Sequence, residues 1–289
     1  MMPTQKKVKK IALLPNAITA FGLICGLFAI FKMNMTGVGE ANLQVLTFTT
    51  ALLLVAAFAD VLDGAVARAM KAESDFGGVF DCLADAISFG LAPSVIVLKS
   101  LSLSPGSELS ILITAAAMVY SMCGVLRLVR FNISDMLAKE NPQMALAYKK
   151  HFTGLPIPAA AAAAISINLF LISGEFKHYF AISEEARAWL LIASMTLLGF
   201  LMISRWKFPS VKTLRFRVAS FQAIFITTLC AIALFYSILS HFALVLFAIS
   251  WSYIAIALSL SLIRLVTGKR LKKLEEFEPE PDDLEEEDE

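Results

Sequence analysis

Residues 58–90 read FADVLDGAVARAMKAESDFGGVFDCLADAISFG, and this segment is the most informative part of the chain. Two apolar stretches meet in it, and four of its five aspartates lie at their adjoining ends: Asp60, Asp63, Asp81 and Asp85. A charged side chain close to membrane depth is costly, so it indicates a functional site by default. We therefore expect two membrane helices that share one acidic groove.

Helical geometry places each pair of aspartates on one face. At about 100° per residue, Asp60 and Asp63 lie about 60° apart on one helix, and Asp81 and Asp85 about 40° apart on the next. The connection over residues 71–75 is short, so the helices should be antiparallel neighbours. Four carboxylates facing one another would repel strongly unless divalent cations neutralised them. Carboxylate oxygens suit Mg²⁺ and Mn²⁺ alike, and four of them can hold two ions about 3.5–4 Å apart.

The rest of the chain has the composition of an integral membrane protein. Of its 289 residues, 58% are hydrophobic, whereas soluble domains contain roughly 45–50%. Apolar blocks close to the roughly 17–25 residues of a membrane span predict about eight transmembrane helices in an all-α fold. The predicted helices cover residues 15–33, 44–67, 77–98, 109–127, 154–173, 187–204, 216–239 and 242–265.

The distribution of basic residues predicts the orientation. Lysine and arginine favour the cytoplasmic side of a membrane. With eight spans both termini share one side, and that side holds all but four of the 25 basic residues. The exceptions are Lys32, Lys99, Lys177 and Arg187. We predict a multi-pass protein of the cytoplasmic membrane, with both termini and the acidic groove facing the cytoplasm.

We expect the chain to be divided into four regions. A basic N-terminus over residues 1–14 precedes a catalytic transmembrane core over residues 15–204. An additional pair of helices is expected within residues 205–268, and a charged tail within residues 269–289. Residues 275–289 contain 11 of the 24 acidic residues, so we predict that the tail is disordered and solvated.

The spacing around the aspartates resembles the signature of a known enzyme family. The chain carries Asp60-x-x-Asp63-Gly64-x-x-Ala67-Arg68 and, after eight residues, Gly77-x-x-x-Asp81-x-x-x-Asp85. This pattern is similar to the motif of the CDP-alcohol phosphatidyltransferase family, and every motif position is filled. The resemblance implies a core of six membrane helices, extended here by two C-terminal helices, and a homodimer.

The resemblance also implies roles for the motif residues. Asp60, Asp63 and Asp81 would be metal ligands, and Asp85 would lie at the same metals and act as the general base. The CDP-linked donor would be bound by Asp60, Gly64, Ala67, Arg68, Gly77 and Asp81. Physical reasoning alone leaves alternatives open, because small residues also permit close helix packing and an arginine at a helix end can be an interfacial anchor.

These residue types suit transfer of a phosphatidyl group from CDP-diacylglycerol to an alcohol. A carboxylate within hydrogen-bond reach of a hydroxyl can take its proton. Divalent cations neutralise charge on a diphosphate while CMP leaves. The motif contains no cysteine or histidine that could act as an intermediate nucleophile, so we expect a single direct displacement.

Flanking motifs resemble the integral-membrane branch of the family that uses L-serine as its acceptor. They are Leu14-Pro15-Asn16-x-x-Thr19, Ser88-Phe89-Gly90-Leu91-Ala92-Pro93, Arg127-Leu128-Val129-Arg130-Phe131-Asn132 and Phe152-Thr153-Gly154-Leu155-Pro156-x-Pro158. Arg127 or Arg130 would bind the serine carboxylate, and Asn132 and Ser88 would help to orient the substrate. The alternatives are that both arginines are interfacial anchors and that Ser88 bonds to the preceding helical turn.

Two other functions stay open. The same fold could use glycerol 3-phosphate or inositol phosphate, although residues 86–93 contain no basic side chain for an acceptor phosphate. A transporter with an acidic ion site would explain the aspartates but not the glycines, Ala67 and Arg68 at their spacings. The expected partners are CDP-diacylglycerol, L-serine and membrane lipids, with no nucleic acid.

Overall fold

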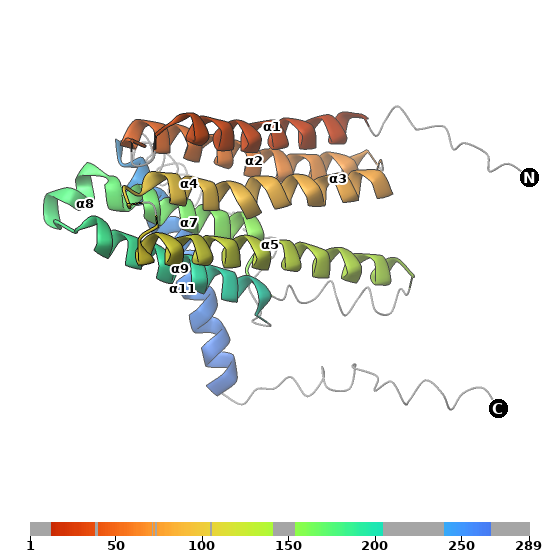
Figure 1. Ribbon diagram of the computed structural model, residues 1–289. Helices are drawn as coiled ribbons and strands as arrows, with labels where there is room; N and C mark the ends of the chain where they lie inside the picture. Colours follow the sequence, from red (N-terminus) through yellow and green to blue (C-terminus); the bar gives the residue numbers. More distant parts are fainter. Residues whose placement is uncertain are drawn as a thin grey trace, which may run out of the picture.

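The computed structural model describes residues 13–37, 40–70, 72, 74–104, 106–140, 154–204 and 240–266. These residues form a bundle of helices, shown in Figure 1, and contain no strand. The elements are α1 (Leu13–Met35), α2 (Leu43–Ala69), α3 (Asp75–Asp85), the π-helix η2 (Ala86–Leu91), α4 (Ala92–Ser100), α5 (Glu108–Glu140), α7 (Ile157–Ile172), α8 (Gly174–Tyr179), α9 (Glu184–Ile203) and α11 (Phe242–Val266).

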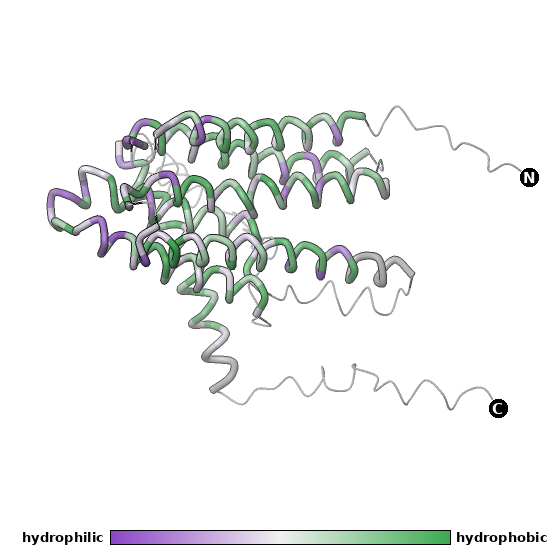
Figure 2. Tube along the Cα trace, in the orientation of Figure 1, coloured by the Kyte–Doolittle hydropathy of each residue, from purple (hydrophilic) through white to green (hydrophobic). Residues whose placement is uncertain are grey.

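The chain is an all-α integral membrane protein. Six helical segments of the described residues are long and apolar enough to cross a membrane: Leu13–Met35, Leu43–Ala69, Phe76–Ser100, Glu108–Ile133, Glu184–Ile203 and Phe242–Ser261. Figure 2 shows apolar residues along these helices, with hydrophilic residues gathered on α2 and α3 and, at the opposite end of the bundle, around α8. Polar groups are therefore concentrated in two places, of which one is the acidic segment.

Most predicted helices correspond to observed ones, with two differences in length. The fifth predicted span is the 16-residue helix α7, which is shorter than the other spans. Helix α5 continues to Glu140, so Arg127 and Arg130 lie within a helix and not at its end. The predicted span 216–239 and most of the two C-terminal regions lie outside the described residues.

The third span is not a regular α-helix. A π-helical segment, η2, follows Asp85 directly and joins α3 to α4. Two side chains from α5 hydrogen-bond to its carbonyls: Tyr120 Oη donates to Phe89 O at 3.0 Å, and Ser121 Oγ to Gly90 O at 2.9 Å. Interruptions of this kind occur frequently at functional sites, and this one follows the last motif aspartate.

Small residues bring α1 close to the acidic segment. A Cβ added at Gly22 would lie 3.3 Å from the Cβ of Ala59 on α2. A Cβ added at Gly26 would lie 2.8 Å from Ser88 Cβ on η2, which is too close for any real contact. The two glycines therefore allow α1 to pack directly on α2 and on the π-helical segment.

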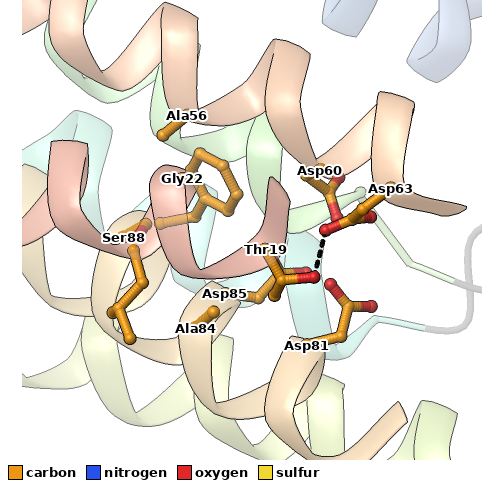
Figure 3. A pocket seen from close by; sticks show the side chains of 11 residues that line it. Thr19, Gly22, Ala56, Asp60, Asp63, Asp81, Ala84, Asp85 and Ser88 are labelled. Carbon is orange, nitrogen blue, oxygen red and sulfur yellow. Dashed lines mark hydrogen bonds between the residues drawn. The ribbon is translucent and has the colours of Figure 1, made fainter. Parts of the chain in front are cut away.

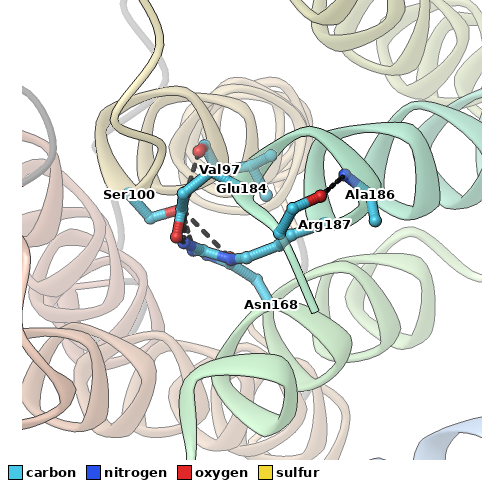
Figure 4. Close-up of polar contacts among 7 residues, drawn as sticks. Val97, Ser100, Asn168, Glu184, Ala186 and Arg187 are labelled. Carbon is cyan, nitrogen blue, oxygen red and sulfur yellow. Dashed lines mark hydrogen bonds and ion pairs between the residues drawn. The ribbon is translucent and has the colours of Figure 1, made fainter. Parts of the chain in front are cut away.

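A polar network joins three helices at the end of the bundle opposite the aspartates. Arg187 on α9 is 4% exposed. As Figure 4 shows, it donates hydrogen bonds to Ser100 Oγ on α4 (3.0 Å), Asn168 Oδ1 on α7 (2.9 Å) and Glu184 Oε2 (3.2 Å). We call these four residues the Arg187 network. A buried guanidinium needs such partners, so the network connects α4, α7 and α9.

Helix α11 packs against α7, and its contacts include two polar ones and a ring stack. Ser250 Oγ lies 2.8 Å from Ser166 Oγ, and Trp251 Nε1 donates to Ala163 O at 3.2 Å. The ring of Phe247 is stacked on that of Phe170, with 4.6 Å between centroids. Beyond these contacts α11 runs obliquely away from the bundle (Figure 1).

Candidate active site

Three of the motif aspartates form a tight group between α2 and α3. One carboxylate oxygen from each of Asp60, Asp63 and Asp81 lies within 4.8 Å of the others. Asp85 is not part of this tight group, but it lines the same cavity, whose empty space of about 200 Å³ includes part of the open solvent at its mouth. Figure 3 shows the four side chains around that cavity. We call these four residues the acidic site.

The local sequence explains why the two helices present the aspartates to each other. Helix α2 ends at Ala69, and Ser74 caps α3 by accepting a hydrogen bond from the backbone N–H of Gly77 at 3.1 Å. The chain therefore reverses within a few residues, and α3 runs back beside α2. Since the carboxylates on the two helices are three and four residues apart, each pair faces the neighbouring helix.

The residues of the acidic site fit a divalent cation. Oδ1 of Asp81 is buried and has no hydrogen-bond partner among the described residues. Asp63 is only 4% exposed, and three oxygen donors of one sign lie close together. Buried acids are normally paired or bound to a metal. The donor set is all oxygen, which hard cations such as Mg²⁺ and Mn²⁺ prefer.

Helix α1 contributes two polar side chains that we did not assign to the site from sequence. Thr19 Oγ1 lies 2.5 Å from Asp63 Oδ2. Asn16 lies beside Gly77 of α3: a Cβ added at Gly77 would be 3.0 Å from Asn16 Oδ1. Both residues belong to the first flanking motif. The signal that could have indicated them is a pair of polar residues in the first two turns of an apolar helix.

Of the residues expected to bind the nucleotide, Asp60 and Asp81 line the cavity, whereas Gly64, Ala67, Arg68 and Gly77 do not. A Cβ added at Gly64 would lie 3.4 Å from a terminal nitrogen of Arg68, so the exposed Arg68 side chain reaches back over Gly64. The carbonyl of Ala67 accepts a hydrogen bond from the N–H of Ala72 at 2.9 Å, near the end of α2. Gly77 faces Asn16 and Ser74.

Of the four residues expected to bind the acceptor, two come close to the acidic site. Ser88 lines the cavity and is 2% exposed, and its Oγ has no partner among the described residues. The alternative bond to the preceding helical turn is therefore not formed. Arg127 is half-buried and interacts electrostatically with Asp85 and with Tyr253 of α11. Arg130 is exposed and Asn132 half-buried, and neither lines the cavity.

Comparison with known proteins agrees with the motif. The profile of the CDP-alcohol phosphatidyltransferase family matches residues 12–200. This range contains α1 to α8 and most of α9, and therefore the whole acidic site. More than half of the chain is thus matched.

Several curated proteins with one shared name are similar in sequence. The CDP-diacylglycerol–serine O-phosphatidyltransferase of Helicobacter pylori is 30% identical over 219 residues, which are 76% of this chain and 81% of that protein. The protein of this name from Bacillus subtilis is 32% identical over 69% of this chain and 91% of its own length. That from Mycobacterium leprae is 32% identical over 70% of this chain and 60% of its own length.

Proposed function

The chain belongs to the CDP-alcohol phosphatidyltransferase family, and from this premise we propose that it transfers the phosphatidyl group of CDP-diacylglycerol to L-serine. The products are phosphatidylserine and CMP. The observation that carries the proposal is the meeting of four motif aspartates at one cavity between α2 and α3. The shared name of the relatives supports serine as the acceptor.

The reaction needs a base for the serine hydroxyl. The hydroxyl oxygen forms a bond to the phosphorus of the phosphatidyl group, the bond from that phosphorus to the CMP oxygen breaks, and the hydroxyl proton passes to Asp85. Asp85 suits this role because it lines the cavity but stands outside the tight group of three. A positioned carboxylate of this kind typically contributes about 10²–10⁴-fold to a rate.

The other three aspartates would bind the cations. Asp60, Asp63 and Asp81 would bind the divalent cations, two per site, as Mg²⁺ or Mn²⁺. When bound there, the cations neutralise the diphosphate of the donor. Arg68, whose guanidinium lies over Gly64, would contact the donor phosphates at the end of α2, because its planar fork matches phosphate oxygens.

Arg127 is the better placed of the two arginines to bind the serine carboxylate. It interacts electrostatically with Asp85, its Nε is buried without a partner among the described residues, and Arg130 is exposed one turn further on. Ser88 adds a buried hydroxyl that has no such partner to the wall of the cavity. These groups offer donors for the carboxylate and the hydroxyl of the acceptor.

The acidic site would open to the cytoplasm. Arg68, Arg127 and Arg130 lie on helices α2 and α5, whose C-terminal ends point the same way in Figure 1. Basic residues favour the cytoplasmic side. Labelling of a cysteine placed at Ala72 or at Gly106 with a membrane-impermeant maleimide tests this orientation. Ala72 should react only from the cytoplasmic side and Gly106 only from the other side, and the reverse pattern would contradict it.

A panel of acceptors tests the proposed function. The purified protein is given CDP-diacylglycerol and Mn²⁺ with L-serine, glycerol 3-phosphate or inositol phosphate, and CMP release is measured. We expect release with serine and formation of phosphatidylserine. Release with a phosphorylated alcohol alone would select another acceptor. No release with any of the three would contradict a transferase and favour a transporter with an acidic ion site.

A further inference from the structure

We propose that Thr19 of α1 is a positioning residue, which holds the carboxylate of Asp63 in the orientation that the cation site requires. The inference rests on the proposed function, because Asp63 matters to turnover only if the acidic site binds cations. Thr19 lies about 40 residues before the first motif aspartate in the printed sequence, so it belongs to a helix that the motif itself does not include.

The contact is short and buried. Thr19 is 7% exposed and Asp63 is 4% exposed. The distance of 2.5 Å between Thr19 Oγ1 and Asp63 Oδ2, drawn as a dashed line in Figure 3, compares with 3.1 Å to the carbonyl oxygen of Pro15. Hydroxyl-to-carboxylate hydrogen bonds are about 2.5–2.7 Å long and stronger than neutral ones. The hydroxyl therefore donates to the aspartate in preference to its own helix.

The packing of α1 keeps this hydroxyl at the level of Asp63. Gly22, which lies three residues after Thr19, contacts Ala59, and Gly26 contacts Ser88. Because neither glycine position has room for a methyl group, α1 is packed closely on α2 and η2. The closely packed helix α1 therefore fixes the position of the Thr19 hydroxyl.

A carboxylate that accepts one hydroxyl hydrogen bond still has lone pairs for a cation. Such partners fix the orientation of metal ligands, and their loss typically costs about 10–100-fold in metal affinity or activity. Thr19 therefore restricts a side chain whose neighbours Asp60 and Asp81 repel it.

Thr49 provides a matched control. It is a fully buried threonine on α2 whose hydroxyl bonds to the carbonyls of Val45 (3.0 Å) and Leu46 (3.1 Å), within its own helix. Substitution of Thr19 or Thr49 by valine removes one buried hydroxyl from a membrane helix without changing its shape. The two variants differ in whether that hydroxyl touches an aspartate.

The test is Mn²⁺ binding by the full chain in detergent, without lipid substrate, measured from the electron paramagnetic resonance of free Mn²⁺. We expect Thr19→Val to raise the Kd for Mn²⁺ about tenfold, and Thr19→Ser, which keeps the hydroxyl, to stay within about twofold of wild type. Thr49→Val should bind Mn²⁺ like wild type.

In the Asp63→Asn background, Thr19→Val should cause no further change in the Kd for Mn²⁺. At saturating Mn²⁺ the KM of Thr19→Val for serine should match wild type.

Wild-type affinity in Thr19→Val, or an equal loss in Thr49→Val, would overturn the positioning role and leave the proposed function standing. A wild-type protein that binds no Mn²⁺ would instead overturn the cation site together with this inference. Should Thr19→Val fail to fold, Thr19→Ala takes its place as the variant without a hydroxyl, with the same expected loss.

Discussion

At the scale of single residues, the four motif aspartates are not equivalent. Asp60, Asp63 and Asp81 share a cluster of oxygens, whereas Asp85 lines the cavity beside them and is followed by the π-helical segment. The simplest assignment that this geometry supports is that three aspartates are metal ligands and Asp85 is the base. This assignment can be tested, because loss of a ligand affects donor binding whereas loss of the base affects turnover.

For Asp85→Asn we expect turnover to fall by at least about 10²-fold, because the variant cannot accept the serine proton. Binding of CDP-diacylglycerol in the presence of Mn²⁺ should persist, since the cluster of three is intact. CMP release and equilibrium binding measure the two quantities separately. The control is Asp81→Asn, which should lose both. Near-normal turnover of Asp85→Asn would show that the base role is wrong.

Arg127 and Arg130 form a second residue-scale comparison. Arg127→Ala should raise the KM for serine by at least about tenfold, because a charged hydrogen bond is typically worth about 1.5–3 kcal/mol. The KM for CDP-diacylglycerol should change much less. Arg130→Ala serves as the control and should have a smaller effect, since its side chain is exposed. An equal rise of both KM values in Arg127→Ala would indicate a structural arginine.

At the scale of elements, the position of α1 depends on two glycines. Gly26→Ala should lower the melting temperature and the activity, because the new methyl group would overlap Ser88 and push α1 away from η2. Gly78→Ala is the control: nothing lies within 4 Å of its added Cβ, and alanine favours a helix by about 0.5–1 kcal/mol over glycine. Thermal unfolding in detergent compares the two. Similar stabilities would mean that α1 tolerates displacement.

Apolar block length was sufficient to predict most helices, because a membrane requires continuous apolar segments. Motif spacing likewise indicated which aspartates come together, since helical periodicity sets their faces. The π-helical segment η2 was not predicted, because its carbonyls are bonded by Tyr120 and Ser121 of another helix. The role of Thr19 was missed for the same reason: its contact with Asp63 depends on how α1 packs.

At the scale of the whole molecule, the part of the chain that the structure describes has two polar regions at opposite ends of a bundle. The acidic site lies between α2 and α3, and the Arg187 network joins α4, α7 and α9 at the other end. The acidic site would catalyse the transfer reaction, and the Arg187 network holds three helices together. The division into regions at residues 14, 204 and 268, and the homodimer implied by the family, stay predictions.

Arg187→Met should destabilise the bundle by roughly 1–3 kcal/mol, because Ser100, Asn168 and Glu184 lose their shared partner. The melting temperature in detergent should fall, while the KM values of the folded enzyme stay unchanged. Lys177→Ala, at an exposed position on α8, is the control and should be neutral. A changed serine KM in Arg187→Met would mean that the network acts on the acidic site.

The position of bound cations tests the central claim most directly. Crystals of the protein grown with Mn²⁺ and CDP-diacylglycerol, measured at the manganese absorption edge, would reveal each ion by its anomalous scattering. We predict manganese peaks between Asp60, Asp63 and Asp81, beside the diphosphate. Peaks elsewhere, or a diphosphate bound away from these carboxylates, would contradict the account.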